Sequence, residues 1–218
     1  VDGQAHILGN MVLSPSGDMY IVDRNLPLVY RKRANEDKLK AVMGLRNMIS
    51  MRGVARNDDG SVMYIGDREM GIAVIDVKNG RTGPLGVPST LNLGGIDGLY
   101  FKDNSLVIVQ NGIKPQRLML LQLDASGTQV TGVVPMAVAQ PEFDSPSYGT
   151  IRGEDLYYFG SSHWAGSPKP FKAVPVMRTP LNSGKELVQP DVRHFLEKQA
   201  EAQKKKGLEK EQQEKEEQ

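Results

Sequence analysis

Short apolar runs alternate with polar turns along most of the chain, and the clearest case surrounds Asp103 and Asn104. The apolar segments Leu99–Lys102 and Leu106–Gln110 flank this polar pair. Two such segments around a two-residue polar turn predict a pair of antiparallel strands. The same alternation recurs elsewhere, so the sequence predicts many short strands.

The hairpin is one copy of an internal repeat. Residues 11–24 match residues 54–68 with one residue inserted, and each copy runs strand, turn, strand, Asp-Arg. The step from Asp23 to Asp67 is 44 residues, and Asn111 follows after the same step. Repeats of this length predict a fold built from copies of one supersecondary unit.

Further extended segments follow each inner hairpin. We expect them at residues 28–33 and 39–43, 72–77 and a Gly- and Pro-rich return, 117–123 and 130–136, and 174–178. A divergent fourth copy at residues 149–162 has no clear outer strand. Four strands at a period near 44 residues predict the blades of a β-propeller. A meandering β-sandwich also has regular strands and turns, but the recurring Asp-Arg pair favours the propeller.

The predicted fold is therefore all-β, with repeats near residues 8–50, 51–94, 95–140 and 141–190. The 23 glycines and 13 prolines agree with many turns and few long helices. From about residue 191 to residue 218 the composition changes to charged helix-forming residues without an apolar stripe. We expect a charged tail there that is partly helical or disordered.

Charge and cysteine content exclude several classes of function. The net charge of +1 provides no concentrated basic face for a nucleic acid, and no apolar run is long enough to span a membrane. The absence of cysteine excludes zinc ribbons and cysteine hydrolases. The absence of cysteine does not indicate a cellular compartment, and a periplasmic or secreted location stays open if a further segment precedes Val1.

One face of the predicted propeller gathers the polar candidates. In each blade the second strand ends at the face where the first strand begins, so Asp97 and Asn111 are expected side by side. Asp23, Asp67 and Ser162 end their own second strands at this face, near Arg52. The sequence therefore predicts a site at the mouth of the central channel.

The segments Gly95-Ile96-Asp97-Gly98-Leu99-Tyr100 and Gln110-Asn111-Gly112 resemble bacterial propellers of the senescence-marker, gluconolactonase and luciferin-regenerating-enzyme superfamily. The resemblance extends through Pro141–Pro146 and Ser161–Trp164. It implies a ring of six blades, of which this chain would be the C-terminal four. It also implies a metal-dependent lactone or ester hydrolase, with calcium or zinc as the divalent metal.

By this resemblance Asp97 is a metal ligand, whereas Arg52 stands where the family has a metal-binding Asn. His163 lies next to Trp164 in a loop at the proposed site face, and a titratable imidazole there suits general acid or base chemistry. The catalytic candidates are Asp97 and His163. The expected ligand-binding residues are Arg52, Asp97, Asn111 and His163.

Other interpretations of these polar residues stay open. Asp97 lies between Gly95 and Gly98 in a glycine-rich segment, where a short carboxylate can serve only to stabilise the turn. The pairs Asp23-Arg24 and Asp67-Arg68 are either substrate clamps or ties between neighbouring blades.

The expected function is binding of a small molecule at the channel mouth, with hydrolysis as the enzymatic possibility. The alternative is a non-catalytic propeller scaffold that binds a protein or peptide. We expect neither a nucleic acid nor a membrane as partner, and the sequence does not determine the oligomeric state.

Overall fold

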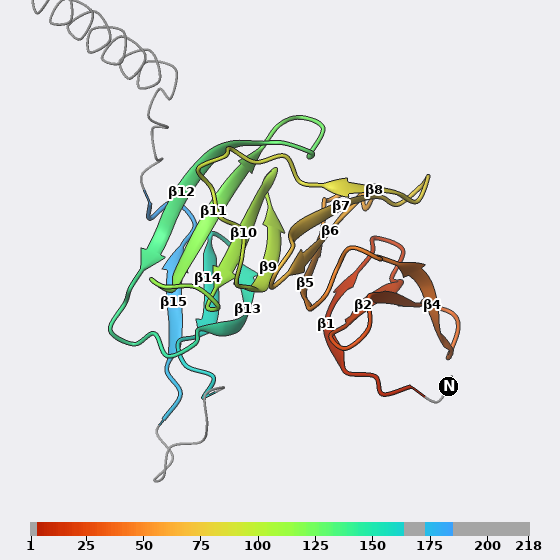
Figure 1. Cartoon of the computed structure of the whole chain (residues 1–218), viewed down its shortest axis with the longest axis horizontal. Helices are drawn as coiled ribbons and strands as arrows, with labels where there is room; N and C mark the ends of the chain where they lie inside the picture. The colour runs from red at the N-terminus through yellow and green to blue at the C-terminus, as the bar shows by residue number, and fades with distance from the viewer. Residues whose placement is uncertain (1–3, 164–172, 185–218) are drawn as a thin grey trace, which may run out of the picture. The chain divides into compact units, whose positions relative to one another are not determined.

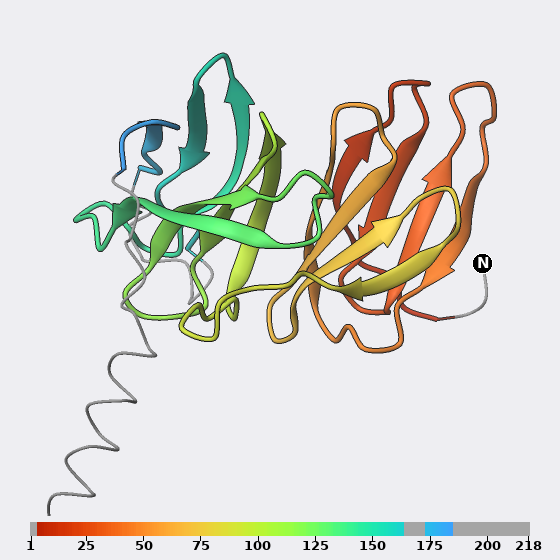
Figure 2. The same cartoon turned by 90° about the horizontal axis from the view of Figure 1, so that it is seen from above.

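The computed structural model describes residues 4–163 and 173–184, and these residues form strands and turns without a helix. The strands form four separate sheets (Figures 1 and 2). Within the described residues no helix could span a membrane.

The strands of each sheet follow one another along the chain. The first sheet contains β1 (Leu8–Leu13), β2 (Met19–Asp23), β3 (Leu28–Lys32) and β4 (Leu39–Gly44). The second contains β5 (Met51–Arg56), β6 (Val62–Asp67), β7 (Gly71–Asp76) and β8 (Arg81–Pro84). The third contains β9 (Ile96–Lys102), β10 (Ser105–Gln110), β11 (Arg117–Leu123) and β12 (Val130–Val138). The fourth contains β13 (Ser147–Arg152), β14 (Asp155–Phe159) and β15 (Val176–Pro180).

Every sheet is an antiparallel meander in which each strand pairs with the next. This is the blade of a β-propeller, and the predicted all-β propeller is confirmed. The fourth blade has three strands in the described part of the chain. Residues 174–178 were expected to be extended, and β15 covers most of that range.

The turns between the first two strands of the blades need unusual backbone angles. Gly17 and Gly60 have φ of 85° and 75°, which side chains with a Cβ rarely adopt. Asp103 and Asn104 have φ of 46° and 54°, as a type I′ hairpin requires at both central residues. These local demands explain why the turns could be recognised in the sequence.

The apolar side chains of the described residues form three clusters, one between each pair of consecutive blades. The first lies between blades one and two around Val22, Val54 and Ile65. The second lies between blades two and three, and the third between blades three and four. Strand β10 of blade three is an example, because its side chains are buried on both faces of the sheet. Each middle blade is therefore packed on both sides.

The first strands of consecutive blades contact one another, so β1 lies against β5, β5 against β9, and β9 against β13. Strands β5 and β9 approach each other closely at Gly53 of β5. A Cβ built on Gly53 would lie 2.5 Å from Cβ of Leu99 in β9. The absence of a side chain at Gly53 lets the inner strands of blades two and three pack closely.

Blades one and four are joined by a polar contact. Arg24 donates from Nη1 to the hydroxyl of Tyr148 at 3.1 Å. Within residues 4–163 and 173–184 no apolar cluster joins these two blades, and Met11, Leu13 and Val176 are exposed. A ring of six blades stays a prediction.

The charged tail expected over residues 191–218 lies outside the described residues, as does Trp164.

Candidate functional site

The acidic residue that ends the second strand has a structural role in the second blade. Asp67 is completely buried at the end of β6. Its Oδ2 accepts hydrogen bonds from the backbone N–H groups of Ile49 and Ser50, at 2.8 and 2.7 Å. Its Oδ1 accepts from Glu69 and Met70, at 2.9 and 3.0 Å. Both oxygens therefore hold loops in place.

Asp23 plays the same part in the first blade. Its Oδ1 accepts from the backbone N–H groups of Ile7, Asn25 and Leu26, and its Oδ2 lies 2.7 Å from Nδ1 of His6. Burial by itself raises the pKa of Asp23, but the hydrogen bonds from Asn25 and His6 outweigh it, so the pKa lies below its ordinary value.

A cavity of about 230 Å³ lies where the inner strands of blades two and three begin. Arg52 is the second residue of β5, and Asp97 is the second residue of β9. Asn111 directly follows β10, and Arg68 directly follows β6. The residues that line the cavity are Arg52, Arg68, Asp97, Asn111 and Ser145. We call it the mouth cavity.

Arg68 connects blade two to blade three inside this cavity. Its Nη1 donates to Oδ1 of Asn111 at 3.0 Å and lies 3.6 Å from Oδ1 of Asp97. A Cβ on Gly112 would come within 3.1 Å of the Arg68 guanidinium, so the glycine makes room for that group. Asn111 is held from the other side, since its Nδ2 donates to the carbonyl of Pro146 at 2.9 Å.

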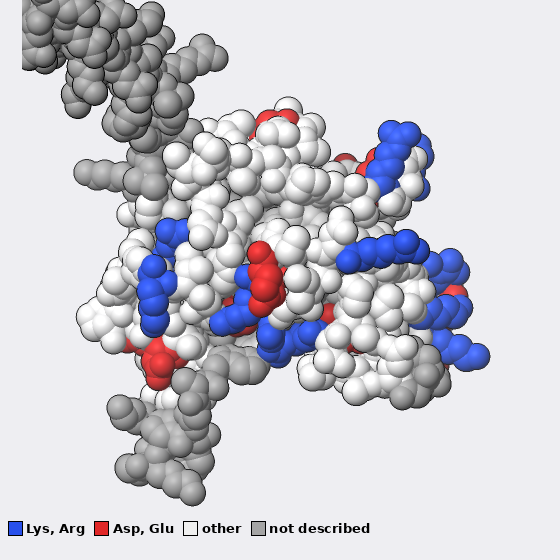
Figure 3. All heavy atoms as spheres, in the orientation of Figure 1, with Lys and Arg blue, Asp and Glu red and all other residues white. Residues whose placement is uncertain are grey.

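Asp97 is the buried charge of the site, with 5% of its surface exposed. Burial raises the pKa of this carboxyl above its ordinary value, while Arg68, Arg24 and Asn111 counteract the shift in part. A carboxylate kept in such an environment is costly for the fold, which is common at functional sites. Basic and acidic side chains meet near the middle of the visible face in Figure 3.

This shift predicts how stability depends on pH. Below its ordinary pKa of 3.8, Asp97 is protonated in both the folded and the unfolded chain, and the contribution of the protonated side chain to stability is fully present. Between 3.8 and the raised pKa of the folded state, the unfolded chain gives up this proton more readily than the folded chain, so that contribution is lost as the pH rises. The free energy of unfolding of the parent protein should therefore fall relative to that of Asp97→Asn across this window and keep a constant difference above it. Thermal melts of both proteins between about pH 3 and about pH 8 measure the difference, and parallel curves would contradict the prediction.

The structure brings three of the four expected ligand-binding residues together. Arg52, Asp97 and Asn111 line the mouth cavity, whereas His163 is not among its lining residues. Nδ1 of His163 lies 3.5 Å from the hydroxyl of Ser161. The role of His163 as an acid or base stays a prediction.

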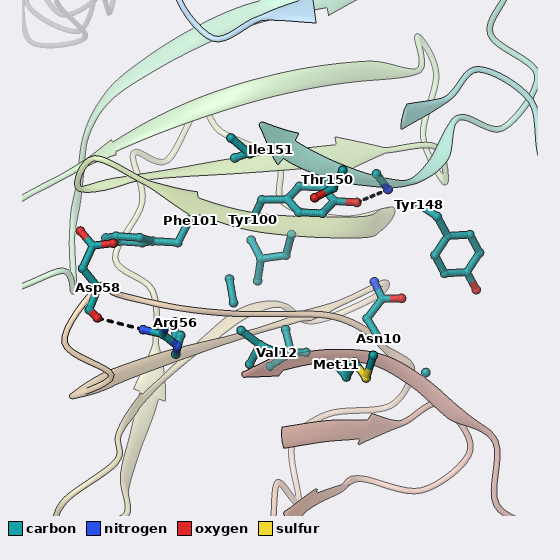
Figure 4. A pocket seen from close by; sticks show the side chains of 15 residues that line it. Asn10, Met11, Val12, Arg56, Asp58, Tyr100, Phe101, Tyr148, Thr150 and Ile151 are labelled. Atoms are coloured by element: carbon teal, nitrogen blue, oxygen red, sulfur yellow. Dashed lines mark hydrogen bonds between the residues drawn. The ribbon is translucent and has the colours of Figure 1, made fainter. Parts of the chain in front are cut away.

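A second cavity, of about 610 Å³, is bounded by the first strands of all four blades. Figure 4 shows its lining, with Asn10 and Val12 of β1 on one side of the space and Tyr100 of β9 on the other. The hydroxyl of Tyr100 accepts a hydrogen bond from the backbone N–H of Gly149 at 2.6 Å. Burial raises the pKa of Tyr100, so this hydroxyl stays protonated. None of the four expected ligand-binding residues lines this channel cavity.

The mouth cavity fits the predicted divalent metal poorly. Calcium and zinc need several oxygen or nitrogen ligands around one point, but Asp97 is the one carboxylate in the lining, and two guanidiniums share the cavity with it. Within the described residues no group of three acidic, histidine or cysteine side chains could hold a metal ion. The residues of the mouth cavity therefore give the predicted metal little support, and metal binding stays a prediction.

Two lining residues were not among the expected ligand-binding residues. Arg68 was considered only within the pair Asp67-Arg68, as a substrate clamp or a tie between blades. The structure separates the two members of that pair, because Asp67 holds loops while Arg68 reaches the cavity and contacts the next blade. Ser145 was noted only within the motif Pro141–Pro146. It has φ of 61° and its backbone N–H donates to Oε1 of Gln116, so a loop conformation brings it to the cavity.

No protein-family model matches the sequence, and a comparison with curated proteins yields no match. Solved structures are similar in fold. Virginiamycin B lyase from Staphylococcus aureus is 17% identical with a TM-score of 0.58, over 88% of this chain and 59% of that chain. Luciferin-regenerating enzyme is 17% identical with a TM-score of 0.57, over 83% of this chain and 63% of that chain.

An auxiliary nutrient binding protein from Bacteroides thetaiotaomicron is 13% identical with a TM-score of 0.55, over 69% of this chain and 42% of that chain. This chain spans less than two thirds of the length of each of these three structures. At such identities the similarity shows the fold alone. The predicted resemblance in fold to the propellers that include luciferin-regenerating enzyme is confirmed.

Proposed function

We propose that this propeller binds a small molecule in the mouth cavity. The observation that carries the proposal is that Arg52 of β5, Asp97 of β9 and Asn111 after β10 line one cavity, and that the carboxylate of Asp97 is buried there. A concave site with a few converging polar groups and one perturbed carboxyl is typical of small-molecule sites.

The proteins of similar fold include a lyase and a nutrient binding protein. Both agree with a small-molecule function, and they do not choose between catalysis and binding. Hydrolysis of an ester or lactone is the enzymatic form of the proposal. Its catalytic candidates are Asp97 in the mouth cavity and His163, which lies outside the lining of that cavity. Turnover of such a substrate in the presence of Ca²⁺ or Zn²⁺ would support it.

The proposal is tested by following the backbone amide signals of the ¹⁵N-labelled protein while small probes are added. The probes are Ca²⁺, Zn²⁺, δ-gluconolactone, choline, lactate, lactamide and inorganic phosphate. We expect at least one of them to shift the signals of Asp97 and Asn111 in a saturable way. For that probe Asp97→Ala should weaken binding at least tenfold, which corresponds to about 1.4 kcal/mol.

Asp97→Asn is the matched control, because it keeps the size of the side chain and removes the charge. A probe that binds both variants as it binds the parent protein would show that the carboxylate is not part of the site. If no probe shifts these signals, the proposed function is wrong.

A non-catalytic scaffold for a protein or peptide is the second candidate. It is favoured by the exposed apolar side chains of Met11 and Leu13 on β1 and Val176 on β15, since exposed apolar surface marks many interaction sites. Absence of any probe binding at the mouth cavity would favour this candidate.

A further inference from the structure

The mouth cavity carries more positive than negative charge in its lining. Arg52 and Arg68 supply two guanidiniums, and Asp97 is the one carboxylate. Arg24 adds a third positive charge close enough to influence Asp97. Guanidiniums in a partly buried space are the groups that proteins use to bind carboxylates and phosphates.

The other acidic groups of this region lie outside the lining of the cavity, so their charges act on a bound anion from a greater distance. Asp67 accepts four backbone hydrogen bonds through its two oxygens. Glu69 lies close enough to Arg68 to interact with its charge, but it is exposed and absent from the lining. Water screens an exposed carboxylate strongly.

Each of the two arginines donates a hydrogen bond to a neutral oxygen, and Arg68 also lies close to the carboxylate of Asp97. Arg52 donates from Nε to the hydroxyl of Ser50 at 3.1 Å, and Arg68 donates from Nη1 to Oδ1 of Asn111. A guanidinium carries five N–H donors in a planar fork, so it binds several acceptors at once. Side chains oriented before a ligand arrives lose less conformational entropy on binding.

The remaining lining groups add specificity. The hydroxyl of Ser145 can donate to an oxyanion, and the carboxylate of Asp97 can accept from a hydroxyl of the same molecule. The cavity volume of about 230 Å³ corresponds to about eight water molecules. This space suits a molecule of metabolite size.

We propose that the mouth cavity binds a small molecule through an oxyanion, either a carboxylate or a phosphate, which lies between Arg52 and Arg68, while a hydroxyl of the same molecule donates to Asp97. This proposal rests on the proposed function and names the chemical class of its ligand.

The test compares probes that differ in charge but little in shape. Lactate and lactamide share a hydroxyl and a carbon skeleton, and only lactate has the oxyanion. Inorganic phosphate distinguishes a phosphate site from a carboxylate site. We expect lactate or phosphate to bind at least tenfold more tightly than lactamide, with affinities measured from the shifts of the amide signals of Asp97 and Asn111. The affinity for the anion should fall as salt is added.

The decisive variant is Arg52→Gln, which should weaken binding of the anionic probe at least tenfold. Arg81→Gln makes the same charge change at the start of the exposed edge strand β8 and should leave binding unchanged. Arg52→Lys keeps the charge without the planar fork, so we expect intermediate affinity. A thermal melt equal to that of the parent protein shows that each variant is folded.

The proposal is overturned if lactamide or choline binds at the mouth cavity while lactate and phosphate do not. The proposed small-molecule function would then stand with a different ligand class. The proposal also fails if Arg52→Gln and Arg81→Gln weaken anion binding equally, because the anions would then sense only the overall charge of the protein.

Discussion

Asp67→Asn is expected to lower the free energy of unfolding by about 3 kcal/mol. Both oxygens of Asp67 are fully used, since each accepts hydrogen bonds from two backbone N–H groups. Asparagine has one oxygen, and its amide nitrogen would face two N–H donors that the second carboxylate oxygen accepts from in the parent protein. These hydrogen bonds are partly buried, and a donor that loses its partner costs about 1 to 3 kcal/mol. Urea unfolding followed by circular dichroism measures the loss.

Asp37→Asn is the matched control, because Asp37 is exposed in the turn before β4. Its effect should stay below about 0.5 kcal/mol. A loss for Asp67→Asn as small as that for Asp37→Asn would show that the loops on either side of β5 and β6 do not depend on this carboxylate.

Gly53→Ala is expected to lower the free energy of unfolding by about 2 kcal/mol. The added Cβ would lie 2.5 Å from Cβ of Leu99 and 3.0 Å from its backbone nitrogen. A backbone atom cannot rotate away as the end of a long side chain can, so the inner strands of blades two and three would have to move apart. Thermal or urea unfolding measures the change.

Gly83→Ala tests whether this cost comes from the close approach or from the loss of a glycine. Gly83 lies in the exposed edge strand β8, and a Cβ there would meet no atom within 4 Å. We expect an effect below about 0.5 kcal/mol. Gly53 directly follows Arg52, so the displacement of β5 in Gly53→Ala should also move Arg52 and weaken binding of the anionic probes. Equal losses for both alanine variants would argue against tight packing between β5 and β9.

Much of the fold could be predicted because its signals are local. The turn at Asp103 and Asn104 needs two left-handed residues, which that pair supplies readily. The regular step from Asp23 to Asp67 exposed the repeat, and the structure explains the step, because both carboxylates hold loops by the same backbone hydrogen bonds. Four blades followed from these patterns.

The candidate site could be predicted only in part. Asp97 and Asn111 belong to one hairpin, so the register between β9 and β10 brings their ends together. The role of Arg68 could not be predicted in this way. Its guanidinium reaches Asn111 and Asp97 from the neighbouring blade, and no turn or strand register connects them.

The sequence by itself determined the strands, their turns, their order in each blade and the face on which the polar strand ends gather. Backbone hydrogen bonds and turn geometry decide these features over a few neighbouring residues. Only the tertiary structure decided that Asp67 supports loops while Arg68 lines a cavity, and that Arg52, Arg68 and Asp97 line the same cavity. Those positions depend on how the blades pack, and packing is decided by contacts such as Gly53 against Leu99 between residues far apart in the chain.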